Sequence, residues 1–322
     1  MSVLRSCGGV RVSSTPVSGG HLQSRSLIGG TTVRLLVGPD GGKIKVAQFK
    51  SLPNDEGREK KPQLVKLEKN SVKLENNIAR AKRTIFELAY CNPWDYFFTG
   101  TLSPALYERT DLVKAHKDLT QWLQNQGKKY HCKIDFLLVP ELHQDGESWH
   151  FHGLMRGIPD ECLIPFFENQ KLPMSILEKL KKGDPVYNWP AYGAKFGFVS
   201  LEKVKNHEAV AKYITKYINK NLAHSVTEVG AHLYYHSRGL SMGYTIKKGV
   251  LLADSTPFKF QWENDFCKLA TFELNSKNLD MILASFESYD STAYPDLQLF
   301  KQKLTNHTMP SAHPLPTAGG NQ

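Results

Sequence analysis

Two histidines lie in the segment GESWHFHGLM, residues 146–155, with a single phenylalanine between them. Successive side chains of a β-strand project to opposite faces of the sheet, so in a strand His150 and His152 share one face and Phe151 points the other way. Two imidazoles side by side are typical metal ligands, but two ligands do not complete a site. The third ligand must come from another part of the chain.

An Asp-Gly pair lies between this run and the apolar run 133–143, within the segment QDGE. Asp-Gly is typical of a two-residue type I′ hairpin turn, in which both turn residues have positive φ. Such a turn pairs Glu141 with His150, and a four-residue loop with the same centre keeps that register. Directly paired side chains lie about 5 Å apart on one face. The spacing therefore predicts that Glu141, His150 and His152 converge, with His143 as the competing third ligand.

This set of side chains indicates which ion could bind. Two imidazoles and a carboxylate, without a thiolate, suit Mn²⁺ or Mg²⁺, and Zn²⁺ also accepts such a set. A single histidine at either position would more often be a packed or surface residue, but the opposing carboxylate favours a divalent metal ion.

The segment NHEAVAKYITKYINKNLA, residues 206–223, has the pattern of one amphipathic helix that Asn206 can cap. Three aliphatic side chains form its apolar stripe, two tyrosines four residues apart lie along the edge of the stripe, and two lysines lie on the far side. These side chains are Val210, Ile214 and Ile218, then Tyr213 and Tyr217, then Lys216 and Lys220. Tyrosines at such an edge are also common in helices that only pack.

Tyrosine beside a metal ion indicates a particular chemistry. A phenol can act as a covalent nucleophile, but its ordinary pKa of about 10 means that it needs help at neutral pH. A divalent cation can polarise a phosphodiester, and a nearby lysine adds positive charge. Together these groups predict a phosphoryl-transfer centre in which tyrosine displaces a DNA 3′-oxygen and retains the 5′-phosphate.

Both segments resemble a known family. WHFHG followed by YITKY resembles the HUH endonucleases (His, hydrophobic, His), specifically the rolling-circle replication initiators of bacterial plasmids and single-stranded DNA phages. The segment YFFTGTLS, residues 96–103, stands where that family has its first motif, although Gly100 interrupts the usual apolar pattern. The resemblance covers about residues 85–250.

The resemblance implies a role for each of these residues. His150 and His152 would be metal ligands, and Glu141 would be the upstream polar ligand. Tyr213 would be the nicking nucleophile, with Lys216 matching the lysine of the tyrosine-x-x-lysine pattern. The second nucleophile of the two-tyrosine subclass would be Tyr217. The implied fold is a central antiparallel sheet with flanking helices, related to the ferredoxin-like and RNA-recognition folds.

The implied partners are single-stranded or extruded origin DNA, a host helicase and a host polymerase, since the chain has no complete phosphate loop for a helicase of its own. A net charge of +10 favours a polyanionic partner. Basic side chains would grip the DNA backbone. The candidates by position are Lys212, Lys220, Arg238, Lys247 and Lys248.

Other classes fit less well. A cupin needs a glutamate shortly after the histidine pair, and a histidine-triad hydrolase needs a third histidine where Leu154 stands. Relaxases and single-tyrosine transposases of the HUH class are the close alternatives, and a non-catalytic, metal-containing DNA-binding protein is a more distant one. The five cysteines are scattered without a C-x-x-C pair, and the chain has no 18-residue apolar run. We therefore expect a protein without a membrane segment, in the cytoplasm of a bacterial cell.

The chain pattern predicts an α+β fold in which an antiparallel sheet has flanking helices, preceded by a helical N-terminal extension. Residues 1–60 are expected to be a partly disordered extension with two short strands in 32–50, and residues 61–92 a basic amphipathic helix. Residues 93–255 are expected to form the nicking domain, with a helix over 111–127 that Gly127 ends and an insertion over 156–192 that holds one short helix. Residues 256–322 are expected to be a C-terminal extension with a polar tail.

Overall fold

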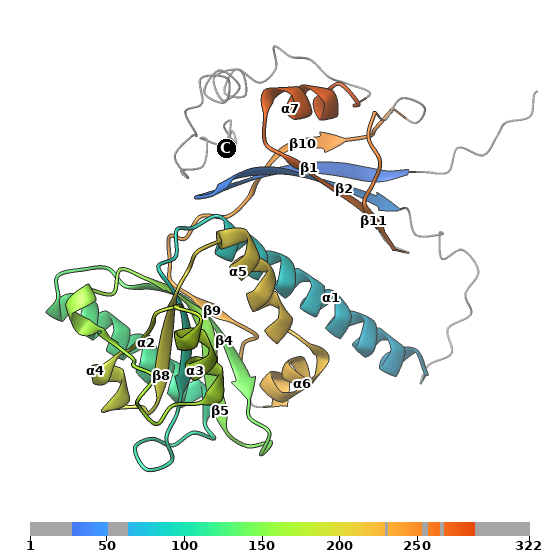
Figure 1. Cartoon of the computed structure of the whole chain (residues 1–322). Helices are drawn as coiled ribbons and strands as arrows, with labels where there is room; N and C mark the ends of the chain where they lie inside the picture. The colour runs from blue at the N-terminus through green and yellow to red at the C-terminus, as the bar shows by residue number, and fades with distance from the viewer. Residues whose placement is uncertain (1–27, 51–63, 229–230, 253–256, 265–266, 287–322) are drawn as a thin grey trace, which may run out of the picture.

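The computed structural model describes residues 28–50, 64–228, 231–252, 257–264 and 267–286. They form two antiparallel sheets with helices against them, as Figure 1 shows. The expected α+β class, with an antiparallel sheet and flanking helices, is confirmed, but the described residues form two such sheets where one was expected. The expected disorder of the first residues and the expected polar tail lie outside the described residues. No helix in the described ranges is long and apolar enough to cross a membrane.

The larger sheet has seven strands in the order β6-β7-β8-β3-β5-β4-β9. Its three central strands confirm the strands expected from the motifs. The central strands are β3 (Tyr96–Thr101), β5 (Trp149–Arg156) and β4 (Asp135–Leu142). The outer strands are β6 (Ile164–Pro165), β7 (Val186–Asn188), β8 (Val199–Lys203) and β9 (Tyr235–His236).

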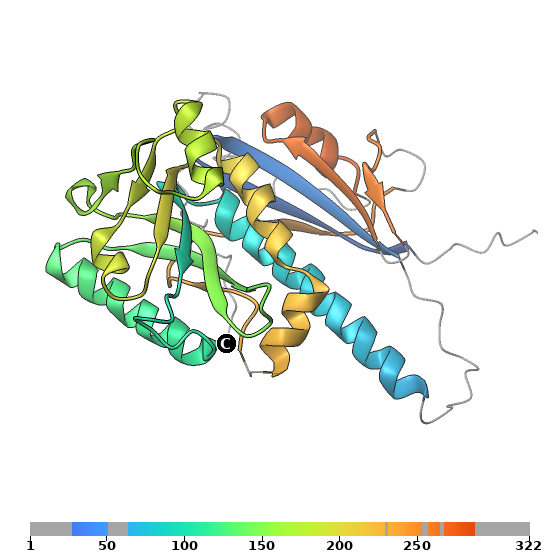
Figure 2. The same cartoon turned by 60° about the horizontal axis from the view of Figure 1, so that its bottom comes forward.

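Alternation along the central strands gives this sheet two different faces. Phe98 and Phe151 are fully buried on one face, where Phe98 contacts Tyr192 of α4 (Pro190–Gly193) and Tyr192 contacts Trp122 of α2 (Leu112–Lys129). The histidines lie on the other face. Figure 2 shows α2 on one side of this sheet and α1, α5 and α6 on the opposite side.

The helix α2 does not end at the expected residue. It continues through Gly127 to Lys129, and His131 takes the positive φ of 52° after its end. A Cβ at Gly127 would lie 2.7 Å from the backbone oxygen of Cys132. This glycine therefore permits a close approach of the returning chain, and it does not stop the helix.

The insertion over 156–192 contains more than the one short helix expected. The expected helix is α3 (Met174–Lys181), but η1 (Asp160–Cys162) and α4 are also present. Its strands β6 and β7 extend the large sheet beyond β8. Strands of two and three residues are too short to give a periodic pattern, so the sequence does not predict them.

The smaller sheet has five strands in the order β10-β1-β2-β12-β11. The two strands expected in 32–50 are confirmed as the hairpin of β1 (Ile28–Gly38) and β2 (Gly41–Lys50). The remaining strands are β10 (Tyr244–Gly249), β11 (Trp262–Glu263) and β12 (Cys267–Glu273), and α7 (Ser276–Leu283) covers one face. One sheet therefore joins segments that the sequence analysis treated as an N-terminal extension, a central domain and a C-terminal extension.

A long helix, α1 (Leu64–Tyr90), lies between the two sheets and confirms the basic helix expected over 61–92 (Figure 1). Glu87 of α1 is 1% exposed and accepts two hydrogen bonds from the Arg34 guanidinium of β1, at 3.2 and 2.6 Å. Just after the helix, the Asn92 side chain donates to the carbonyl of Ser241 and accepts from its amide. These contacts tie the small sheet to the rest of the chain.

Replacing Arg34 by Ala should lower the free energy of unfolding by about 3 kcal/mol, because the Glu87 carboxylate would stay buried without its partner. Urea denaturation followed by circular dichroism would measure this change. The control is Lys205→Ala, which removes an exposed ion pair with Asp184 and should change the stability little. Equal stabilities of the two variants would contradict a structural role for the Arg34–Glu87 pair.

Candidate metal and tyrosine site

The hairpin of β4 and β5 has the predicted register but not the predicted turn. Glu141 is paired with His150, and the amide of His143 donates to the carbonyl of Ser148 at 2.7 Å. Of the two turn residues only Gly146 has positive φ, at 76°, so the turn is not type I′. The Asp145 carboxylate instead accepts hydrogen bonds from the amides of residues 147 and 148 and holds a four-residue loop. The register is the same for both loops, which is why the prediction of facing side chains is confirmed.

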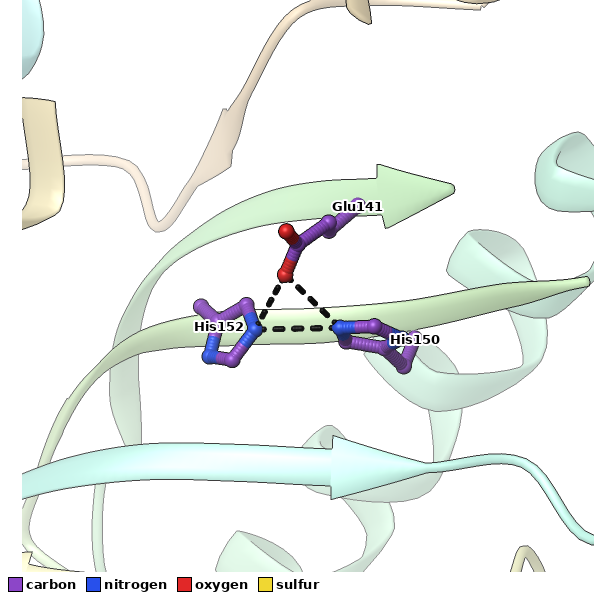
Figure 3. A group of neighbouring side chains, drawn as sticks. All are labelled: Glu141, His150 and His152. Carbon is purple, nitrogen blue, oxygen red and sulfur yellow. Dashed lines mark hydrogen bonds and ion pairs between the residues drawn. The ribbon is translucent and has the colours of Figure 1, made fainter. Parts of the chain in front are cut away.

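The three predicted ligands meet on one face of the large sheet, as Figure 3 shows. The Oε2 atom of Glu141 lies 2.8 Å from Nε2 of His150 and 2.6 Å from Nε2 of His152, and the two imidazole nitrogens are 3.0 Å apart. The side chain of His143 is 52% exposed, and its Nδ1 lies 3.8 Å from Asp145. Among the described residues, the group with ligand atoms close enough for one ion is Glu141, His150 and His152.

The chemistry of these three side chains fits a divalent metal ion. Hydrogen bonds from His150 and His152 hold the pKa of Glu141 at about 2, so its carboxylate is ionised at neutral pH. Burial lowers the pKa of His152, which favours the neutral imidazole that a metal requires. Ligand atoms about 3 Å apart match the spacing around one ion with bonds of about 2.1 Å. The opposite ring nitrogen of His152 lies 3.3 Å from Oγ1 of Thr99, a contact that orients the ring.

The helix expected over 206–223 is interrupted after its first two turns. It consists of α5 (His207–Ile214), the 3₁₀ turn η2 (Thr215–Tyr217) and α6 (Lys220–Glu228). Asn206 caps α5 as predicted, since its side chain accepts from the amide of Ala209 at 2.8 Å. Asn219 accepts from the amide of Leu222 at 2.8 Å in the same way and begins a second helix. A second capping residue inside the pattern was the signal that the sequence analysis missed.

The second tyrosine lies in the 3₁₀ turn, against the candidate metal ligands. The ring of Tyr217 stacks on the ring of His152 with centroids 4.0 Å apart, and its hydroxyl donates to the hydroxyl of Tyr213 at 3.1 Å. Ile214 and Ile218 are fully buried, as the apolar stripe predicted, and Val210 is half-buried. Tyr213 is 44% exposed, and the Lys216 amine lies 5.3 Å from the centre of its ring.

A groove of about 850 Å³ adjoins these side chains. His152, Tyr213 and Tyr217 line it together with residues of the strands β3 and β8 and the helix α3. Phe97 of β3 lies on the same sheet face as Thr99, and its ring meets the edge of Tyr213 at 5.4 Å. Phe97 was not among the predicted site residues, although its alternation with Thr99 in YFFTGT predicts that the two share a face.

The glycine that departs from the first motif has a packing reason. A Cβ at Gly100 would lie 2.3 Å from the ring of Phe98 and 2.5 Å from the hydroxyl of Tyr192. Tyr192 is fully buried against this position. The glycine therefore makes room for α4 on the sheet face opposite the histidines.

The candidate DNA-binding residues do not form one patch. Lys212 is exposed and pairs with Glu208 at 2.7 Å, near the tyrosines, whereas Lys220 begins α6. Arg238 is exposed beside the end of β4 that lies away from the site. The amide of its neighbour Ser237 donates to the carbonyl of Phe136, which is five residues, or about 17 Å, from Glu141 along β4. Lys247 and Lys248 belong to β10 of the small sheet, and Lys247 is buried with its amine 5.7 Å from the ring of Phe286.

A divalent ion should stabilise the protein through the three ligands. Mn²⁺ at about 100 times its Kd should raise the free energy of unfolding by about 2.7 kcal/mol. The double substitution His150→Ala, His152→Ala should abolish this gain, and Thr99→Val should weaken Mn²⁺ binding about 10-fold. Thermal unfolding at increasing Mn²⁺ concentrations would measure both effects. His143→Ala is the matched control, and a loss of Mn²⁺ stabilisation in that variant alone would contradict this ligand set.

Comparison with known proteins finds one family model that matches this region. Residues 95–222 match the model of the Replication-associated protein ORF2 family, a match that covers less than half of the chain but contains the three candidate ligands and both tyrosines. Neither the curated proteins nor the solved structures include a significant match to the chain. The part of the chain around the site is thus similar to replication-associated proteins, and the small sheet lies outside the similarity.

Proposed function

We propose that this protein initiates rolling-circle replication by nicking one strand of origin DNA with a tyrosine. The observation that carries the proposal is the contact between the tyrosine pair and the candidate metal ligands. Tyr217 stacks directly on His152, and Tyr213 lies within hydrogen-bond distance of Tyr217 at the edge of an open groove. The similarity of residues 95–222 to replication-associated proteins supports the same conclusion.

The proposed reaction transfers a phosphoryl group without net hydrolysis. The Tyr213 oxygen attacks the phosphorus of a phosphodiester, a tyrosine–phosphorus bond forms, and the bond from phosphorus to the 3′-oxygen breaks. The phenolic proton leaves to water in the groove, and the departing 3′-oxygen takes up a proton, which yields a free 3′-hydroxyl for a polymerase. A divalent ion bound by Glu141, His150 and His152 would polarise the phosphodiester and stabilise charge on its oxygens. A later 3′-hydroxyl can reverse the step and rejoin the strand.

The environments of the two tyrosines favour a fixed order of attack. Tyr213 is exposed to the groove, accepts a hydrogen bond from Tyr217, and has the positive charge of Lys216 beside its ring. Burial raises the pKa of Tyr217, which opposes formation of its phenolate. Tyr213 is therefore the proposed first nucleophile. Tyr217 would act second, on the strand that arrives when replication ends.

This function requires partners that the chain would recruit. The substrate would be single-stranded or extruded origin DNA, and strand separation and synthesis would fall to a helicase and a polymerase of a bacterial host. The exposed lysines 212 and 216 near Tyr213 carry charge of the sign that a DNA backbone attracts. Their position beside the groove supports DNA as the substrate.

The test is a covalent adduct. The protein is incubated with Mn²⁺ and a labelled single strand that carries the intergenic region of the parent replicon, and mass spectrometry identifies the modified residue. We expect DNA on Tyr213, and we expect Tyr213→Phe to lower the initial nicking rate by at least about 10³-fold, because the nucleophile is removed. Tyr217→Phe should retain the first nick and lose the second cleavage, on a strand that arrives while Tyr213 still carries DNA.

Two controls sharpen this test. Tyr234→Phe removes a hydroxyl from a tyrosine beside β9 and should leave nicking unchanged. EDTA, or the His150→Ala, His152→Ala variant, should abolish the adduct. A folded, Mn²⁺-binding protein that forms no adduct on the true origin would contradict the catalytic proposal and leave a metal-containing DNA-binding protein.

A further inference from the structure

The small sheet has one face that α7 does not cover. Val33, Ile44 and Ala270 pack against α7, so the alternate residues of the same strands point to the opposite face. The register aligns these residues in rows across the strands. One row is Thr245, Arg34, Lys45 and Thr271, and the next is Lys248, Thr32, Ala47, Leu269 and Trp262. We call this surface the open sheet face.

Positive charge gathers where the open sheet face meets α1. Arg34 is engaged by Glu87, and Arg83 lies one helical turn before Glu87 on the same side of α1. Lys45 is half-buried between these groups, and burial, with repulsion from Arg83 and Arg34, lowers its pKa despite the opposing effect of Glu87. Among the described residues, neither the Lys45 amine nor the Arg83 guanidinium has a hydrogen-bonding acceptor. Arg34, Lys45 and Arg83 thus lie around one carboxylate, that of Glu87, and Arg34 is already paired with it. The other two cations can therefore bind an anion.

Aromatic side chains lie on the same face beside this charge. Phe49 is 45% exposed and Trp262 is 50% exposed, and neither lines the groove beside the tyrosines. Phe49 follows Lys45 by four residues on β2, which places it about 14 Å further along the same face. Trp262 lies on β11, two strands away from β2, and is paired with Leu269 of β12. Exposed aromatic rings next to cations are the combination that binds single-stranded nucleic acid, because the rings stack on bases and the cations hold phosphates.

We propose that the open sheet face is a second binding surface for single-stranded DNA, separate from the tyrosine site. Lys45 and Arg83 would bind backbone phosphate, and Phe49 and Trp262 would stack on unpaired bases. A double helix would not offer its bases to these rings, so a single strand is the fitting ligand. The choice of DNA as the nucleic acid rests on the proposed function, but the surface itself lies outside residues 95–222 and uses none of the nicking residues.

The tryptophans provide a specific test of the stacking. Trp262 is half exposed, whereas the other tryptophans of the chain are buried, namely Trp94, Trp122, Trp149 and Trp189. Poly(dT) added to the full-length protein in EDTA should therefore quench the fluorescence of Trp262, and Trp262→Phe should remove the quenching. Quenching that persists in that variant, or that is equally strong with duplex DNA, would overturn the stacking of single strands.

Charge variants test the phosphate contacts. The double substitution Lys45→Gln, Arg83→Gln should weaken poly(dT) binding about 10-fold and reduce the slope of log K against log salt by about 0.7 for each lost contact. Lys268→Gln is the matched control, because Lys268 lies on the α7-facing side of β12 and pairs with Glu263. An unchanged affinity and salt slope in the double variant would overturn the proposal.

The outcomes separate this surface from the nicking site. Normal quenching and salt dependence in a protein that forms no tyrosine adduct would support the surface and contradict only the nicking function. The opposite result is an origin adduct together with a Lys45→Gln, Arg83→Gln variant that binds poly(dT) as tightly as the original protein. That result would support the nicking function and contradict the second binding surface. Circular dichroism of each variant confirms that the fold is intact.

Discussion

The pairing register between β4 and β5 is the constraint on which the site depends. Side chains alternate along a strand, so a slip of one residue would move Glu141 to the face opposite His150 and His152 and separate the three candidate ligands. The Asp145 side chain holds the loop that connects the strands, and β3 pairs along the other edge of β5 with Thr99 against His152. The candidate metal site is thus a consequence of strand pairing on both sides of one strand.

A second constraint is the interruption between α5 and α6. The helical backbone of α5 continues through the 3₁₀ turn that holds Tyr217, and it becomes extended at Ile218, just before the new cap at Asn219. Tyr217 then stacks on His152, and Tyr213 faces the groove. The buried Ile214 and Ile218 anchor the turn on the core, so the tyrosines sit on a packed segment and not on a free loop.

The small sheet is built from both ends of the described chain and is attached through α1. Its apolar face is covered by α7, and its other face meets α1 through the buried Arg34–Glu87 pair. A hydrogen-bonded pair between Asp40 and His207 connects the β1–β2 turn to the start of α5. The small sheet therefore contacts the first residue of α5, the helix that carries Tyr213, and supports the position of this tyrosine.

The amino-acid sequence determined the local geometry of the site. The Asp-Gly loop and the period of two along a strand placed Glu141 beside His150 and His152, and the four-residue spacing of Tyr213 and Tyr217 placed them on one side of a helical segment. These relations depend on residues close in the chain, so pattern alone predicts them. The sequence also indicated an α+β fold with an antiparallel sheet, because strands and helices alternate without a regular order.

Only the tertiary structure decided which distant segments meet. The stacking of Tyr217 on His152, the packing of Tyr192 against Gly100, and the charge cluster of Arg34, Lys45 and Arg83 each join residues far apart in sequence. The assembly of one sheet from β1, β2, β10 and β12 could not be predicted, because no local pattern records the partner of a strand. The candidate basic residues were chosen by charge alone, and charge does not reveal that Lys247 packs inward while Lys248 faces out. Strand pairing and burial determine these contacts, since both depend on the free energy of the whole folded chain.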